Sequence, residues 1–117
     1  MKKIILVCIF ILPLYSSPYS DGKNLYYAKG CANCHGTQAE GSGNFPKLAN
    51  KKQKYLLQKL KSFQNGKSNT QMGQMMFSFA KSLNKKELKS ITIYLSQHKE
   101  DNSDKYRVSE DILGSVD

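Results

Sequence analysis

Hydrophobic residues recur at helical spacing in the middle of the chain. Within residues 51–66, Leu56, Leu60 and Phe63 follow the spacing of three or four that places side chains on one face of a helix. Gly66 is suited to end that helix, because glycine readily adopts the left-handed conformation common after a last turn. The pattern therefore predicts a helix over 51–66.

The clearest helix start lies at Asn84. Its side chain can cap a helix, and Glu87 three residues on makes a variant of the capping box. Leu83 and Leu88 are placed for a hydrophobic staple across this start. The apolar stripe that follows consists of Leu88, Ile91 and Leu95, with Tyr94 beside them. We expect this helix to end near Lys99.

The remaining pattern predicts a short first helix and two long loops. Residues 21–30 are the expected first helix, which Asp21 can cap. Residues 31–50 and 65–74 are rich in polar and turn-forming residues and are predicted to be loops. The second loop leads into a hydrophobic segment, 75–83. No useful run alternates with period two, so we predict an all-α domain of three to five short helices. Loops this long are unusual in a small domain, and we expect them to wrap a bound group that takes the place of missing core side chains.

Residues 1–20 have the three-part layout of a secretory signal: two lysines, an apolar run, and small residues at Ser16, Ser17 and Ser20. The apolar run is about half of the roughly 20 residues that a membrane-spanning helix needs. We therefore expect export and cleavage rather than a membrane anchor or a buried helix. Pro18 sits awkwardly for cleavage after Ser20, and Ser16 or Ser17 can serve instead.

Charge divides the rest of the chain into a domain over 21–99 and an acidic tail over 100–117. The whole chain carries a net charge of +9. Residues 22–99 hold fourteen lysines against two glutamates, a balance of +12, whereas the tail has a balance of −4. The tail lacks a sustained apolar period, so we expect it to be disordered.

The basic body favours acidic protein partners, although lysines retained for solubility are an equal alternative. Nucleic acid is not an expected partner, because an exported chain does not normally meet it. No basic stripe interleaved with stacking aromatics stands out either.

Residues 31–35 read Cys-Ala-Asn-Cys-His, the signature for covalent attachment of c-type haem. Loss of Cys8 with the signal leaves Cys31 and Cys34 as the two thiols of the exported chain. They would join the haem vinyl groups as thioethers. His35 would lie under the iron as the proximal ligand.

Other uses of the cysteine pair are weaker. A zinc ribbon needs further ligands, and the other histidine, His98, is far along the chain, where we expect it to be solvated and without a function. A thioredoxin-like site needs a βαβ context, which the pattern lacks. A plain structural disulfide stays open as the remaining alternative.

Several segments together resemble the class I c-type cytochromes, in particular the small bacterial carriers with one haem. The segments are GKNLYYAKGCANCHG, FPKL, a helix with Tyr-Leu, a loop with methionines, and LNKKELKSITIYLSQ, and the resemblance covers about residues 21–99. It implies a cytochrome c-like fold wrapped around one covalent haem c. It also implies a periplasmic one-electron carrier in a respiratory or related redox chain, without catalytic residues. Together with the basic body, this role leads us to expect redox partner proteins with acidic docking surfaces, and contact with the membrane only through partner complexes.

The resemblance further implies a methionine as the second iron ligand. Related carriers place it seven residues before the leucine that precedes the last helix. That leucine is Leu83 here, so the count selects Met76. Met75 and Met72 are the alternatives, and all three could instead fill core with Phe79.

The resemblance also implies roles for several individual residues. Pro46 resembles the proline whose carbonyl accepts a hydrogen bond from the proximal histidine, although an ordinary loop proline is an equal alternative. Gly22, Tyr26 and Tyr94 resemble the residues at the crossing of the terminal helices. The expected walls of the haem site are Tyr55, Leu56, Leu60, Phe63 and Phe79.

Two other function classes stay open. The domain could be the electron-accepting subunit of a periplasmic dehydrogenase, bound to it stably. It could also be a haem sensor or a peroxidase-like protein, which would need an open sixth position on the iron.

Overall fold

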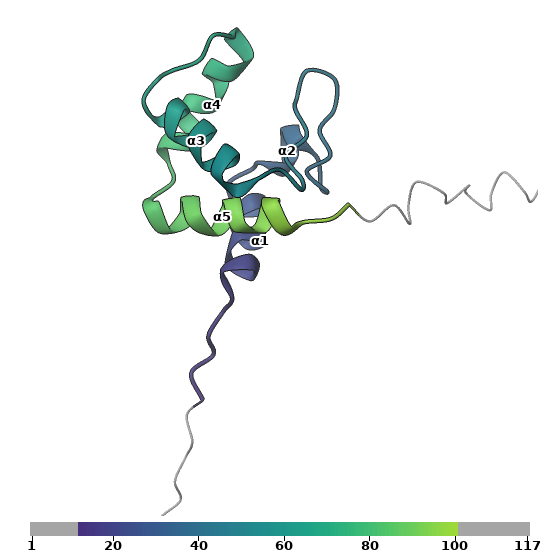
Figure 1. The fold of residues 1–117 in the computed structure, drawn as a ribbon, viewed down its shortest axis with the longest axis vertical. Coiled ribbons are helices and arrows are strands. Elements are labelled where there is room, and N and C mark those ends of the chain that lie inside the picture. The colour runs from purple at the N-terminus through teal and green to yellow at the C-terminus, as the bar shows by residue number, and fades with distance from the viewer. Residues whose placement is uncertain (1–11, 101–117) are drawn as a thin grey trace, which may run out of the picture.

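The computed structural model describes residues 12–100, and in this part of the chain it is helical, without a named strand (Figure 1). The five helices are α1 (Pro18–Ala28), α2 (Ala32–His35), α3 (Gln53–Gln64), α4 (Gln71–Lys81) and α5 (Lys85–Gln97). The predicted all-α class and the predicted range of three to five helices are confirmed. Residues 1–11 of the expected signal and 101–117 of the expected tail lie outside the described residues.

The first helix begins three residues earlier than predicted. Ser17 is its N-cap, and its hydroxyl accepts a hydrogen bond from the backbone N–H of Ser20 at 3.1 Å. Pro18 occupies the first helical position, where its missing N–H costs nothing. Asp21 therefore lies in the first turn, where its charge complements the helix dipole, and is not the cap.

The fourth helix also begins earlier than predicted, at Gln71 instead of residue 75. Thr70 caps it, and its hydroxyl accepts from the N–H of Gly73 at 3.0 Å. The polar residues after the cap are compatible with a helix that is exposed on one side.

In the segment 31–50, predicted to be loop, the structure instead contains the single turn of α2.

The helices α3 and α5 follow the sequence prediction closely. α3 ends just before Gly66, which has a φ of +67°. At the start of α5, Asn84 and Glu87 each accept the other's backbone N–H at 2.9 Å, so the predicted capping box is present. Leu83 and Leu88, the predicted staple, are both buried in the same core cluster.

The central packing contact is the crossing of α1 and α5, as Figure 1 shows at the base of the helical body. At Gly22 an added Cβ would lie 2.0 Å from the carbonyl oxygen of Ser90 and 2.7 Å from the Cβ of Tyr94. Only a residue without a side chain therefore fits. The rings of Tyr26 and Tyr94, both buried, lie 5.6 Å apart beside this contact, and Tyr19 packs edge-on against Tyr94 at 5.2 Å. The predicted crossing of the terminal helices is confirmed.

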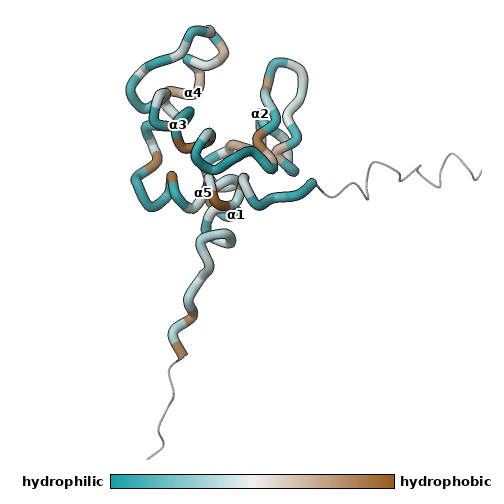
Figure 2. Tube along the Cα trace, in the orientation of Figure 1, coloured by the Kyte–Doolittle hydropathy of each residue, from teal (hydrophilic) through white to brown (hydrophobic). Residues whose placement is uncertain are grey.

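The helix α3 joins this pair to α4, since it packs against both α4 and α5. Leu56 is its buried residue. The side-chain amide of Gln64 donates to the carbonyls of Ala80 and Leu83, each at 2.9 Å, and so holds the end of α4. Figure 2 shows hydrophobic segments in brown where α1 meets α5 and along α3 and α4. None of the described helices is long and apolar enough to cross a membrane.

The Gly22 contact yields a test of the fold. Replacing glycine with alanine inside a helix normally stabilises it by about 1 kcal/mol. At Gly22, however, the new methyl group would meet the Ser90 carbonyl, and overpacking of this kind costs about 1–3 kcal/mol or more. We therefore expect Gly22→Ala to lower the free energy of unfolding by about 2 kcal/mol in urea denaturation. The control is Asn24→Ala on the exposed side of α1, which should be neutral or slightly stabilising. Equal stability of Gly22→Ala and wild type would contradict the close crossing.

Candidate haem-binding site

The site is organised around His35, the last residue of α2, which is only 6% exposed. Its Nδ1 lies 2.8 Å from the carbonyl oxygen of Pro46. Because a carbonyl oxygen only accepts, Nδ1 carries the proton and the lone pair of Nε2 is left for a ligand. The hydrogen bond predicted for Pro46 is confirmed. It orients the ring in the way that partners of metal-binding histidines do.

The segment between α2 and α3 holds the Pro46 carbonyl in place by backbone hydrogen bonds. The N–H of Gly41 donates to the carbonyl of His35 at 2.8 Å. Leu48 and Ala49 both donate to the carbonyl of Ala39, at 2.9 and 3.0 Å. Ala39 is buried at a φ of +53°, an uncommon conformation for a residue with a side chain. The segment is therefore a folded support for the histidine rather than a loose connection.

Two tyrosines of α1 attach this segment to the first helix. The hydroxyl of Tyr26 donates to the carbonyl of Gly36, and that of Tyr27 donates to the carbonyl of Thr37, both at 2.6 Å. Tyr26 is fully buried, whereas Tyr27 is 44% exposed. Burial raises the pKa of Tyr26 above its usual value, so its hydroxyl remains a donor.

Cys31 is the N-cap of α2 and Cys34 lies within that helix; both are half-buried thiols that are not joined to each other. The structure therefore does not contain the disulfide that the sequence left open. Burial raises the pKa of the Cys31 thiol, which favours its neutral form. Two thiols and a buried imidazole within five residues are the donor set that haem c requires.

These three residues line a cavity between the helices, which is open to the surface. All five helices contribute to the lining, which comprises Tyr26, Lys29, Cys31, Cys34, His35, Leu48, Leu60, Met76, Phe79, Ala80, Leu83, Ile91 and Leu95. The wall is almost wholly apolar, so its residues fit a large, flat, largely apolar group such as haem.

Of the three candidate methionines, Met76 is the one that lines this cavity. Met72 and Met75 belong to the same helix, α4, but are 38% and 56% exposed and do not line it. The structure thus places Met76 with His35 and the two cysteines. Its role as a ligand stays a prediction.

The expected walls are confirmed only in part. Leu60 and Phe79 line the cavity, whereas Tyr55 does not and is 49% exposed. Leu56 is buried in the core cluster and does not line the cavity, and Phe63 packs against Phe77 with 6.3 Å between ring centroids. Helical spacing alone could not distinguish these neighbouring faces of α3.

His98 is not the solvated residue that we expected. It is half-buried, its Nε2 lies 2.9 Å from the Oε1 of Gln38, and its ring lies 5.1 Å from that of Tyr94. It therefore connects the end of α5 to the segment after α2. No local signal in the sequence could have paired residues sixty positions apart.

Sequence reasoning also missed several lining residues. Ile91 and Leu95 were recognised as the apolar stripe of α5, and the structure shows that this stripe reaches the cavity. Leu48 belongs to FPKL, a segment of the family pattern, but had no assigned role. Lys29 was one lysine among fourteen, and nothing in the sequence distinguished it.

Comparison with known proteins gives consistent results. The family model for cytochrome c matches residues 19–99. Cytochrome c-552 of Acidithiobacillus ferridurans is 36% identical over 66 residues, which are 56% of this chain and 27% of that protein. Cytochrome c-554(547) of Halothiobacillus neapolitanus is 34% identical over 83 residues, which cover 64% of this chain and 90% of that protein.

Among solved structures, cytochrome c4 of Acidithiobacillus ferrooxidans is similar with a TM-score of 0.56 and 32% identity. The match covers 68% of this chain and 49% of that chain. That structure is described as supporting a complex-induced tuning of electron transfer. This chain therefore spans only part of cytochrome c-552 and of cytochrome c4, and nearly the whole of cytochrome c-554(547).

The two tyrosines of α1 allow a matched test of how the site is supported. Tyr26→Phe leaves the Gly36 carbonyl without its buried donor, and losing such a bond typically costs about 1 kcal/mol or more. Tyr27→Phe removes a bond of the same length at an exposed position, where water can replace the hydroxyl. We expect Tyr26→Phe to lower the midpoint of urea unfolding and Tyr27→Phe to change it little. Equal effects of the two variants would contradict the buried role of Tyr26.

Proposed function

Because the chain belongs to the cytochrome c family and that family carries covalent haem c, we propose that this protein is a one-electron carrier of the periplasm. It would serve a respiratory or related redox chain and would have no catalytic residues. The observation that carries the proposal is the position of His35 and Met76 in the lining of one apolar cavity, beside both cysteines of the attachment motif.

In this proposal Cys31 and Cys34 would hold the haem as thioethers, and His35 and Met76 would be the protein ligands of its iron. The bound haem supplies the one-electron exchange between ferric and ferrous iron. With two ligands supplied by the protein, the iron would have no open position for a substrate, which would favour electron transfer over catalysis. A histidine and methionine pair also raises the reduction potential relative to many other haem ligations.

The chain's own residues contribute orientation and exclusion of water. The Pro46 carbonyl fixes the His35 ring, so the imidazole needs no rearrangement when the charge of the site changes. The apolar residues of the cavity lower the local dielectric constant around the site. Phe79 lines the cavity and is also 46% exposed, which brings the cavity wall to the surface of α4.

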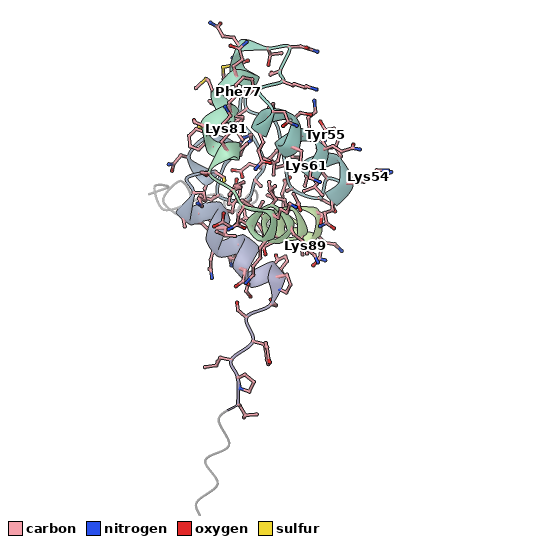
Figure 3. The ribbon with its side chains drawn as sticks, turned by 90° about the vertical axis from the view of Figure 1, so that its left-hand side faces the viewer. Lys54, Tyr55, Lys61, Phe77, Lys81 and Lys89 are labelled. Atoms are coloured by element: carbon pink, nitrogen blue, oxygen red, sulfur yellow. The ribbon has the colours of Figure 1, made fainter. Side chains whose placement is uncertain are left out.

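Charge supports transient docking to an acidic partner. The lysines labelled in Figure 3, Lys54 and Lys61 on α3, Lys81 on α4 and Lys89 on α5, are all exposed. Opposite charge on a partner would raise the rate of encounter, and salt would lower that rate. A stable complex with a dehydrogenase on purification would instead favour the role of an enzyme subunit.

The periplasmic location requires export, and the structure bears on where a signal would be removed. Ser17 caps α1, and Tyr19 packs against Tyr94, so a cut after Ser20 would remove both contacts. A cut after Ser16 keeps them. We therefore expect N-terminal sequencing of the exported protein to give Ser17 as the first residue. A first residue of Asp21 would show that the cap is dispensable.

The assignment of Met76 is tested by the far-red absorption band that arises from charge transfer between a methionine sulfur and ferric iron. We expect the oxidised wild type to have this band and Met76→Ala to lose it. Met75→Ala, one residue away on the exposed side of α4, is the matched control and should keep it.

Absence of the band from the wild type would contradict the carrier proposal and favour a sensor or peroxidase-like protein with an open position. If Met75→Ala loses the band and Met76→Ala keeps it, Met75 is the ligand.

A further inference from the structure

Lys29 is an unusual member of the cavity lining, because it is a charged residue. The lining surface is apolar, so the cavity meets the carbon chain of Lys29 and not its ammonium group. Lys29 follows α1 as its C-cap and precedes Cys31 by two residues. Its side chain is 32% exposed, so most of it is withdrawn from water. A charge at this position acts in a medium of lower dielectric constant than the other lysines experience on the open surface.

The ammonium group of Lys29 contacts the turn between α4 and α5 and the first turn of α5. Its Nζ donates to the carbonyl of Ser82 at 3.4 Å and lies 3.9 Å from the Oε1 of Glu87. Ser82 is the C-cap of α4, where the helix dipole favours a positive charge. The Lys29 head is therefore held by two partners.

Glu87 is itself held in place. Its Oε2 accepts the N–H of Asn84 in the capping box, and its side chain is 24% exposed. The carboxylate also lies in the first turn of α5, where the helix dipole favours a negative charge. The ion pair thus joins three helix ends at fixed positions next to the cavity.

We propose that the Lys29–Glu87 pair sets the reduction potential of the haem, with Lys29 raising it and Glu87 lowering it. Ferric haem carries one more positive charge than ferrous haem. A fixed positive charge beside the cavity therefore disfavours the oxidised form, and a fixed negative charge stabilises it. Lys29 is the nearer of the two by this geometry, since it lines the cavity and Glu87 does not. Lys29 thus acts on the reduction potential through its charge and is not an iron ligand.

The test is the reduction potential of the exported, haem-loaded protein in spectroelectrochemical titration. Lys29→Met keeps the length of the side chain and removes its charge. We expect it to lower the equilibrium constant for reduction by about threefold or more, which at about 59 mV per tenfold is about 28 mV. Lys23→Met removes the same charge from an exposed position on the same helix and should shift the potential much less.

Two further variants give the opposite sign and the rescue. Glu87→Gln keeps the capping box, because glutamine serves at this position, and should raise the potential. Lys29→Arg keeps the charge, so its reduction potential should equal that of the wild type to within the scatter of the measurement. If the ion pair has a purely structural role, Lys29→Met and Glu87→Gln should shift the midpoint of urea unfolding in the same direction. They should then not shift the reduction potential in opposite directions.

This inference rests on the proposed carrier function, but the two can fail separately. A reversible one-electron titration of the wild type supports the carrier whatever the variants do. Equal potentials in Lys29→Met and Lys23→Met would overturn the role of Lys29. If Lys29→Met fails to load haem, the sign of the Glu87→Gln shift decides, and a fall or no change would overturn the proposal.

Discussion

The close crossing of α1 and α5 at Gly22 is the contact on which the haem site depends. It fixes the end of α1, from which the Cys31–His35 segment continues directly, against the last helix of the fold. The same two helices supply Tyr26 to the segment after α2, and Ile91 and Leu95 to the cavity wall. An interaction between residues nearly seventy positions apart therefore positions a motif of only five residues.

The support of His35 follows from that arrangement. Its ring is oriented by Pro46, whose segment is tied to α1 by Tyr26 and to the end of α5 by His98 through Gln38. The helices α3 and α4 close the remaining side, and α4 brings Met76 to the cavity. An apolar cavity left empty costs stability, roughly in proportion to its volume. A covalent cofactor would thus complete the core of a domain that is small for its long connecting segments.

Much of this architecture could be predicted from local signals. The capping box at Asn84 and the apolar spacing of α3 lie within one or two helical turns, so the sequence contains them completely. The Cys-x-x-Cys-His motif is equally local and specific. The helices α1 and α4 begin earlier than predicted. The prediction for α1 excludes residues 1–20 as signal, and α4 begins with a polar turn after its cap, Thr70.

The features that the sequence could not predict are tertiary contacts. The spacing of α3 predicts one apolar face but not which of its residues reach the cavity: of the expected wall residues, Leu60 lines the cavity and Tyr55 does not. The contacts of His98 with Gln38 and of Lys29 with Glu87 join residues that are far apart in the chain. The roles of Gly22, Tyr26 and Pro46 became visible only through resemblance to a family, and the structure then confirmed their contacts.

We propose that one haem c would lie in this cavity, with the protein's own His35 and Met76 as the two ligands of its iron. The most direct measurement is the absorption spectrum of the reduced, exported protein before and after exposure to carbon monoxide, which binds ferrous haem at an open position. We expect no change in the spectrum, because neither ligand leaves a vacancy. A prompt shift of the haem bands on adding carbon monoxide would contradict the claim.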